Sequence, residues 1–363
     1  MIKNSVHSAK NVPSDVLSPN DYIIVIGASA GGFQAIKKII KELPKDFRPP
    51  VFIVWHTGAE TTGVMPGVLN KLNSIFASYA LDDEEIKPNR IYIAPPDNHM
   101  LLIENTIKLS KGPKENHFRP AIDPLFRSAS YYFGSRTIGI ILSGALDDGT
   151  SGLWKIKIAG GIAVVQDPND AEVKSMPATA LRDVKTDYCA PASEIAKLLT
   201  QIIENTPLES VYEDKQTALE IQSAAGSFQA ERESFNLGQL SPFTCPECHG
   251  VLSRITEGNV QRYRCHTGHV FSAAVLLESL QNRIENDLYT AMAGMDECSM
   301  LLNHLGDHLA EMNNSSAAAF YFIKAKETEA HAEALRKNLK NFQQLSYLMP
   351  EADSKNLKNE TKC

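Results

Sequence analysis

The sequence has no apolar run that approaches the ~18 residues of a membrane-spanning helix. Residues 1–21 also lack an apolar stretch of signal-peptide length, so we expect no membrane insertion and a cytoplasmic location. Positive charge is scarce as well, because 36 Lys and Arg stand against 43 Asp and Glu, for a formal net charge of −7. These numbers argue against a protein that binds nucleic acid through bulk positive charge.

An alternation of strand and helix patterns dominates the first half of the chain. Its short β-branched runs are typical of buried strands, and they include residues 23–26, 51–55 and 137–142. Between such runs, apolar residues recur at helical spacing, as in residues 33–43. Strands that alternate with helices pair in parallel. We therefore predict an α/β fold with a doubly wound, mostly parallel sheet over residues 21–206, after a disordered lead-in over residues 1–20.

The remainder divides into four further segments. Residues 207–241 carry six acidic and two basic residues and predict an acidic linker. A small cysteine-rich module follows at 242–272, then an α-helical hairpin at 273–345 and a polar tail at 346–363. Leu and Met recur at threes and fours along the first helix of the hairpin. This stripe predicts mutual packing of the two helices or a homo-oligomer formed through them.

A glycine-rich turn follows the first predicted strand. It reads Gly27-Ala28-Ser29-Ala30-Gly31-Gly32 and fits the G-x-S-x-G pattern that presents a nucleophilic serine. The helix that follows directs free N–H groups at the same spot, which suits an oxyanion. Taken alone, such a turn is more typical of a phosphate-binding loop.

Two other strand ends change this interpretation. The second strand ends in Trp55-His56, where a dinucleotide fold would have an acidic residue for the ribose. The strand at 137–142 runs into a loop with Asp147-Asp148-Gly149, and no Walker pattern is present. Ends of parallel strands meet at one edge of a sheet, so Ser29, His56 and one of these aspartates form a candidate triad. The alternatives are a hydrogen-bonding histidine and an N-capping aspartate with no catalytic role.

Four segments carry a resemblance to a known family. The stretches IGASAGG, IYIAPPDNHMLL, RPAIDPLFRSA and ILSGALDDGTSGL resemble the catalytic domain of the chemotaxis protein-glutamate methylesterases (CheB) over about residues 20–205. The resemblance implies that Ser29 is the nucleophile and His56 the base. It also implies that Asp148 orients the histidine, while Asp147 occupies a variable position of the loop.

The same resemblance implies a function. It is the hydrolysis of glutamate side-chain methyl esters on chemoreceptor-type proteins in chemotaxis-like signal transduction, with glutamine deamidation as a second activity of some members. The implied partners are methylated chemoreceptors or similar helical signalling proteins, and catalysis needs no cofactor. A receiver domain typically precedes this domain in the family, whereas about twenty residues precede the first strand in this chain, so we expect a receiver-less variant.

Two substitutions depart from the family pattern. Ala30 stands where a threonine is common, which removes a hydroxyl but keeps the turn. Leu146 replaces a glycine in the loop Ser143-Gly144-Ala145-Leu146, and a branched residue avoids positive φ. We therefore expect a restricted backbone in this loop, from which a donor near Ala145 could complete the oxyanion site.

The cysteine-rich module has the spacing of a structural zinc site. Cys245 and Cys248 form a C-x2-C pair, and Cys265 and His269 form a C-x3-H pair sixteen residues later. We predict these four as Zn²⁺ ligands, with His249 and His266 as alternatives for the fourth position. A filled ligand set predicts a structural metal and not a catalytic one. Some receiver-less relatives of the methylesterases have a similar cysteine-rich tail followed by helices.

Two other functions stay open on the sequence alone. The first is a catalytically weak or silent scaffold that uses the same cleft to bind a signalling partner. The substitutions in the 143–146 loop are the reason to consider this alternative. The second is a nucleotide-binding domain joined to a nucleic-acid-binding zinc ribbon. The residues Arg254, Arg262, Tyr263 and Arg264 give that ribbon a small basic and aromatic patch.

Overall fold

The fold of the first half is built on a seven-stranded parallel sheet. The structure, a computed structural model, describes residues 16–18, 21–56, 63–205 and 214–346. The sheet has the strand order β10-β9-β8-β1-β2-β5-β3, and every pairing within it is parallel. Its strands are β1 (Ile23–Ala28), β2 (Val51–Trp55), β3 (Phe76–Tyr79), β5 (Arg90–Ile93), β8 (Thr137–Ile141), β9 (Ile162–Gln166) and β10 (Tyr188–Ala190).

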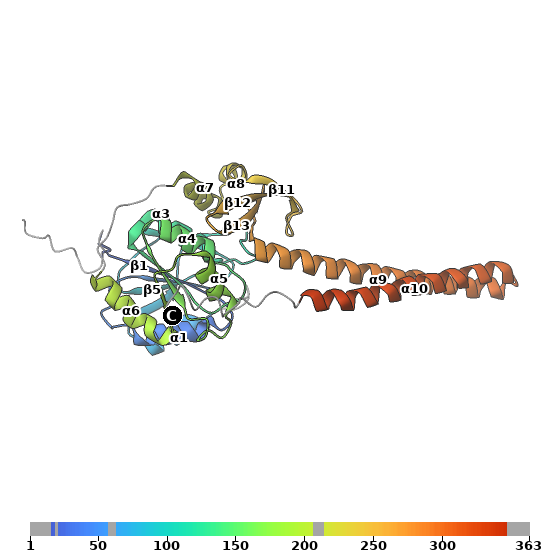
Figure 1. Cartoon of the computed structure of the whole chain (residues 1–363), viewed down its shortest axis with the longest axis horizontal. Helices are drawn as coiled ribbons and strands as arrows, with labels where there is room; N and C mark the ends of the chain where they lie inside the picture. Colours follow the sequence, from blue (N-terminus) through green and yellow to red (C-terminus); the bar gives the residue numbers. More distant parts are fainter. Residues whose placement is uncertain (1–15, 19–20, 57–62, 206–213, 347–363) are drawn as a thin grey trace, which may run out of the picture. The chain divides into compact units, whose positions relative to one another are not determined.

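Alternate side chains of the inner strands enter two separate cores. Ile24 and Ile26 belong to the core on one face of the sheet, and Ile23 and Val25 belong to the core on the other. The first core is covered by α1 (Gly32–Glu42), α2 (Val64–Leu72) and α6 (Ala192–Asn205). The second is covered by α3 (Ile122–Phe133), α4 (Thr150–Ile158) and α5 (Ser175–Asp183). Figure 1 shows α1 and α6 on the opposite side of the sheet from α3 and α4, so the predicted doubly wound α/β fold is confirmed.

Smaller elements complete this domain. The hairpin pair β6 (His99–Ile103) and β7 (Thr106–Ser110) joins β4 (Glu84–Glu85) in a three-stranded sheet, and a 3₁₀ turn, η1 (Gly134–Arg136), precedes β8. Helix α2 ends at Leu72. Asn73 is extended there, and its amide donates to the carbonyls of Ile40 and Leu43, so the chain turns into the edge strand β3.

The stretch expected to be an acidic linker contains two helices, so that prediction is wrong. Residues 206–213 lie outside the described residues, but α7 (Lys215–Ala224) and α8 (Phe228–Phe235) follow. Asp214 caps α7 and Ser227 caps α8. The polar composition suggested a solvent-exposed linker, but this segment buries some of its polar groups. Glu220 is fully buried and faces arginines from other elements.

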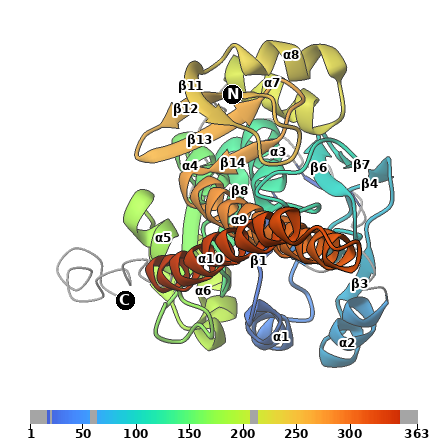
Figure 2. The same ribbon diagram turned by 90° about the vertical axis from the view of Figure 1, so that its right-hand side faces the viewer.

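A four-stranded antiparallel sheet forms the cysteine-rich module. Its strands are β11 (Gln239–Thr244), β12 (Val251–Glu257), β13 (Val260–Cys265) and β14 (Val270–Ser272), in chain order. Figure 2 shows β11–β13 with α7 and α8 on the side of the molecule where α3 and α4 lie, and α7 packs directly on α3. The module is therefore attached to the parallel-sheet domain through side chains of α3, α4 and α7.

Two long helices, α9 (Ala273–Glu311) and α10 (Ser315–Ser346), confirm the predicted hairpin, and most of this hairpin forms a separate compact unit that begins at Leu276. The buried residues of α10 recur every seventh position, and they are Ala318, Ala325, Ala332 and Leu339. Ser299 of α9 donates to Glu329, and Gly306 lies against the ring of Phe322. Small side chains therefore form the seam, while Leu277, Ile284 and Leu305 of the expected stripe stay exposed.

Three expectations concern the chain ends and the membrane. Most of the predicted lead-in over 1–20 and of the polar tail over 346–363 lies outside the described residues. Among the helices in the described ranges, none combines the length and the apolar character needed to cross a bilayer.

Candidate active site

Ser29 lies one residue beyond the carboxyl end of β1. Its N–H donates to the carbonyl of Ser143 at 3.0 Å, and the turn is completed by Gly31 with φ of 73°. A Cβ on Gly32 would lie 2.8 Å from that same carbonyl, so only glycine lets α1 begin this close to the loop after β8. The serine is 8% exposed, which leaves its hydroxyl accessible only at the edge of the sheet.

His56 lies at the carboxyl end of β2, the strand next to β1. Its Nδ1 is 3.3 Å from the Ser29 hydroxyl oxygen, and its Nε2 is 2.8 Å from Asp148 Oδ2. With Nε2–H donating to the carboxylate, Nδ1 presents its lone pair to the serine hydroxyl. The ring stacks on Phe118, with centroids 3.7 Å apart and planes 6° apart, so the imidazole is held on its face as well as at both nitrogens.

Asp148 is the anionic end of this chain of hydrogen bonds. It follows β8, the other neighbour of β1, and is 2% exposed. Burial raises the pKa of its carboxyl, but the hydrogen bond from His56 and the N–H groups of Ile122 (2.7 Å) and Asn116 (3.0 Å) outweigh burial and lower the pKa. The carboxylate therefore stays ionised and can stabilise an imidazolium.

The two neighbouring aspartates have the opposite environment. Burial raises the pKa of Asp147 to about 6, although its carboxylate accepts a hydrogen bond from Ser272. Burial also raises the pKa of Asp123 well above its ordinary range, and the Asp148 charge adds to this rise. Among these three carboxyl groups, only that of Asp148 bonds to His56.

Leu146 adopts φ of 62° in the loop that follows β8, so the expectation that a branched residue keeps this backbone out of the left-handed region is wrong. The Leu146 N–H donates to Ser175 Oγ at 3.0 Å, and this bond helps to hold the conformation. The Gly144 N–H donates to Val173, whereas the Ala145 N–H has no partner within the described part of the chain. Gly144 borders the serine, because a Cβ on it would lie 2.8 Å from Ser29 Cβ.

The four predicted metal ligands lie together in the cysteine-rich module. Donor atoms of Cys245, Cys248, Cys265 and His269 all lie within 4.8 Å of one another. The Cys248 and Cys265 sulfurs are 3.7 Å apart, and His269 Nδ1 lies 3.6 Å from Cys265 Sγ and 3.8 Å from Cys245 Sγ. A tetrahedral ion with metal–sulfur bonds of about 2.3 Å needs sulfurs about 3.8 Å apart. This donor set thus fits a structural metal.

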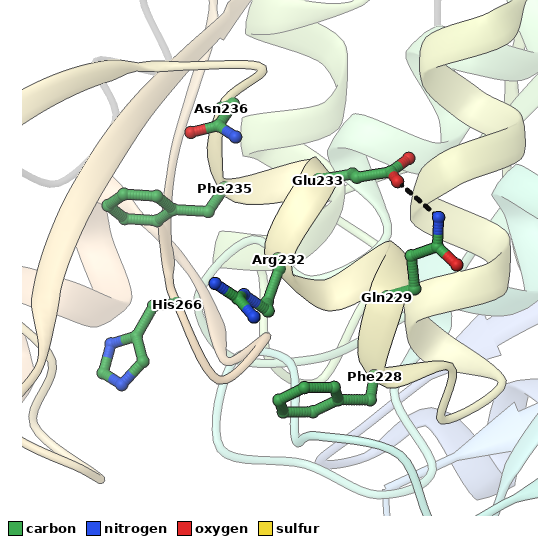
Figure 3. A pocket seen from close by; sticks show the side chains of 7 residues that line it. All are labelled: Phe228, Gln229, Arg232, Glu233, Phe235, Asn236 and His266. Atoms are coloured by element: carbon green, nitrogen blue, oxygen red, sulfur yellow. Dashed lines mark hydrogen bonds between the residues drawn. The ribbon is translucent and has the colours of Figure 1, made fainter.

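The alternative fourth ligands lie elsewhere. His249 and His266 are exposed and do not belong to the cluster. His266 lines a separate hollow of about 530 Å³, together with Phe228, Gln229, Arg232, Glu233, Phe235 and Asn236. In Figure 3 Arg232 points toward the side on which His266 lies, whereas Gln229 and Glu233, which bond to each other, point to the other side of α8.

Of the expected basic patch on the module, Arg254 is exposed but the other two arginines are buried. Arg262 and Arg264 are each 1% exposed. Arg262 bonds to Glu220 and Glu257, and Arg264 lies 3.4 Å from Glu220. Arginines buried and neutralised in this way cannot reach a phosphate backbone, which removes the main support for a nucleic-acid-binding ribbon.

Comparisons with known proteins fall on the parallel-sheet domain. The CheB methylesterase family model matches residues 24–199. A putative protein-glutamate methylesterase/protein-glutamine glutaminase of Leptospira interrogans is 44% identical over 183 residues, which cover 50% of this chain and 95% of the relative. The chain belongs to the CheB methylesterase family. A protein-glutamate methylesterase/protein-glutamine glutaminase of Thermotoga maritima is 35% identical over 185 residues, 50% of this chain and 54% of that one.

A solved structure also aligns with the CheB-type domain. It is the crystal structure of the Thermotoga maritima CheB methylesterase catalytic domain, at 34% identity and a TM-score of 0.48, over 51% of this chain and 99% of that one. Ser29, His56 and Asp148 all lie inside the segment that the family model matches, and the four cluster ligands lie beyond its end at residue 199.

Sequence patterns missed three residues around the triad of this CheB family member. Asn116 bonds to Asp148, Phe118 stacks on His56, and Ser272 bonds to both Asn116 and Asp147. None of them follows a strand of the parallel sheet. The convergence of strand ends at one sheet edge therefore could not predict their position near the triad. The one available signal was their position: Asn116 and Phe118 directly precede the RPAIDPLFRSA segment.

Proposed function

We propose that this chain is a serine hydrolase that removes methyl groups from glutamate side-chain methyl esters of chemoreceptor-type proteins, as the names of its relatives indicate for them. One observation carries the proposal: a continuous hydrogen-bonded chain runs from the Ser29 hydroxyl through His56 to the buried, ionised Asp148. A serine, a histidine and a carboxylate in this order form the arrangement that activates an alcohol for acyl transfer.

Each residue has a step in the reaction. His56 Nδ1 takes the Ser29 proton as the serine oxygen attacks the ester carbonyl, and the imidazolium then protonates the departing methanol. Water deprotonated by the same nitrogen cleaves the acyl-enzyme and releases the glutamate. Asp148 fixes the tautomer and stabilises the imidazolium. The free N–H of Ala145, in the loop that borders Ser29, is the donor we assign to the oxyanion.

The decisive experiment measures methanol release from a methylated chemoreceptor fragment. We expect release by the wild type, and none above background by Ser29→Ala or His56→Ala. Ser78→Ala, on the edge strand β3 of the same sheet, is the matched control and should keep full activity. A fluorophosphonate probe should label the wild type and the control but not Ser29→Ala. A folded wild type that neither releases methanol nor reacts with the probe would instead support the silent-scaffold alternative.

We further propose that Cys245, Cys248, Cys265 and His269 bind one structural Zn²⁺. The support is the spacing of their donor atoms and the burial of Cys245 and Cys265. The chemistry of the set also fits, because three cysteines and one histidine form one of the usual ligand sets of structural Zn²⁺. Four protein ligands leave no open position, so the ion would stabilise the module and take no part in ester cleavage.

The remaining expectations are proposals of the same kind. We place the protein in the cytoplasm, where its proposed substrates present their methylated helices, with glutamine deamidation as a second activity. We also propose the domain limits expected from the sequence, with 207–241 as a helical connection and not a linker. Exposed Leu301, Leu305 and Phe320 on the hairpin support self-association through α9 and α10, which sedimentation of the full chain tests.

A further inference from the structure

The catalytic residues touch a loop that has no place in the parallel sheet. Residues 114–118 lie between β7 and α3 and carry two contacts to the triad. The amide of Asn116 donates to Asp148 Oδ1 at 3.0 Å, and the ring of Phe118 lies flat on His56. The conformation of this loop therefore sets the orientation of both the carboxylate and the imidazole.

The backbone of this loop makes a tight turn. Asn116 has φ of 51° and His117 has φ of 67°, two consecutive residues in the left-handed region without a glycine. Two-residue hairpin turns have this conformation, and here the Phe118 N–H donates to the Glu115 carbonyl at 2.9 Å while the Glu115 N–H donates to Phe118 at 3.3 Å. The other contacts that hold the turn in place come from the cysteine-rich module.

Strand β14 of the module holds the backbone of the loop. Asn116 N–H donates to the Val270 carbonyl at 2.8 Å, and Val270 N–H donates to Lys114 at 3.3 Å. The Ser272 N–H donates at 2.8 Å to Asn116 Oδ1, the other end of the amide that bonds Asp148. One asparagine side chain thus bridges the module and the catalytic carboxylate, and Ser272 fixes which way its amide faces.

Both halves of the metal cluster reach the loop. Glu247, between Cys245 and Cys248, lies 2.7 Å from His117 Nδ1. Val270 directly follows the ligand His269, and the His117 ring lies edge-on to Phe271 at 5.2 Å. An ion that fixes the two pairs of ligands would also fix the groups that hold the turn in place.

We propose that metal binding in the module positions the catalytic triad, with Asn116 and Ser272 as positioning residues. The proposal rests on the proposed esterase function and adds a control to it. When the cluster holds Zn²⁺, the loop is clamped and Asn116 orients Asp148. When the cluster loses the ion, the loop relaxes, and His56 loses both its oriented carboxylate and its stacking partner.

The test follows the rate at which a fluorophosphonate probe labels Ser29 in the full chain, with Zn²⁺ bound and after removal by a chelator. Misplacing a catalytic group by about 1 Å can cost about 100-fold, so we expect metal removal to slow labelling at saturating probe by about 10- to 100-fold. Probe affinity should change little, because the loop contacts the triad and not the probe. Restoring Zn²⁺ should restore the rate.

Asn116→Ala separates positioning from general stability. We expect Asn116→Ala to label slowly with Zn²⁺ bound and to lose little more when Zn²⁺ is removed, because the connection is already cut and the two effects are not additive. Asn70→Ala is the matched control. Its side chain also bridges two backbone groups, both of Ala77 on the edge strand β3, and it should keep the full metal response.

Hydrogen exchange supplies a readout independent of activity. Metal removal should speed exchange in residues 114–118 while β1 stays protected, which also shows that the stripped protein remains folded. Equal labelling with and without metal, or a full metal effect in Asn116→Ala, would overturn the inference while leaving the esterase intact. Absence of labelling in every form would refute the esterase function itself.

Discussion

The parallel-sheet domain and the cysteine-rich module bring their key residues together by different physical means. In the former, strands β8, β1 and β2 are neighbours, and the sheet delivers Asp148, Ser29 and His56 to one edge. In the module, the four ligands come from two short turns. The order of strands in the sheet brings together the residues of the first site, which span more than a hundred positions of the chain. The short spacing between cysteine and histidine residues brings together those of the second.

The source of stability differs in the same way. The sheet has two extensive apolar cores, one on each face. The module instead buries charge: Arg262 and Arg264 meet Glu220 of α7, which also lies 3.4 Å from Arg127 of α3. Burial raises the pKa of Glu220, but the three arginines outweigh burial and hold it well below its ordinary range. The module should therefore depend on a metal and on charge pairing where the sheet depends on apolar burial.

The largest expected effect is on the metal content of the module. Cys248→Ser removes one ligand, and we expect zinc content to fall from about one ion per chain to near zero, since structural sites of this kind need all four ligands. Trp154, whose indole lies against Gly258 of the module, should report the loss by fluorescence. Cys298→Ser, on α9 outside the cluster, should keep its zinc. Retention of zinc by Cys248→Ser would show that the four-ligand assignment is mistaken.

The next effect is on the triad alone. Asp148→Asn should lower kcat for methyl ester hydrolysis by about 10⁴-fold, because an amide can neither fix the histidine tautomer nor stabilise the imidazolium. Asp147→Asn should cost far less, since Asp147 does not contact His56. Steady-state kinetics on both variants measures the difference. Comparable losses in the two would remove the basis for choosing Asp148.

The third effect probes the charges between the two regions. Glu220→Gln leaves three buried arginines without their shared partner, and we expect it to lower the free energy of unfolding by about 3–5 kcal/mol. Glu204→Gln, an exposed change at the end of α6, is the control and should stay within about 0.5 kcal/mol of the wild type. Urea denaturation measures both values. A loss of under about 1 kcal/mol for Glu220→Gln would mean that the buried arginines do not depend on this carboxylate.

The smallest effect depends on pH. The pKa of Asp147 is raised from 3.8 to about 6 in the folded chain, so the folded state binds more protons than the unfolded state between these values, and stability falls as pH rises from about 4 to 6. Asp147→Asn removes this cost, so its stabilising effect should grow from pH 4 to pH 6 and stay constant above. Urea denaturation at pH 4.5 and 7.5 measures it. A stabilisation that does not change between these pH values would mean that Asp147 titrates normally.

The sequence predicted much of the fold because buried strands and amphipathic helices are local signals. It also predicted the grouping of Ser29, His56 and Asp148, since parallel strand ends converge, and that of the cluster ligands, since two short turns define them. It could not predict Asn116 or Glu220, because their partners come from segments more than thirty residues away and their own neighbourhoods are polar. The two edge strands of the parallel sheet, β3 and β10, were not predicted because they are short and half-exposed.

The hairpin of α9 and α10 has a consequence for any partner. A 39-residue helix is about 58 Å long, and its seam of alanine, serine and glycine brings the two backbones close enough to make a stiff rod. Outward-facing side chains on such a rod form lines along its axis. A globular domain would cover only a short part of such a line. Elongated partners, including a second hairpin or the helices of a receptor, are the ones that this geometry can engage along its length.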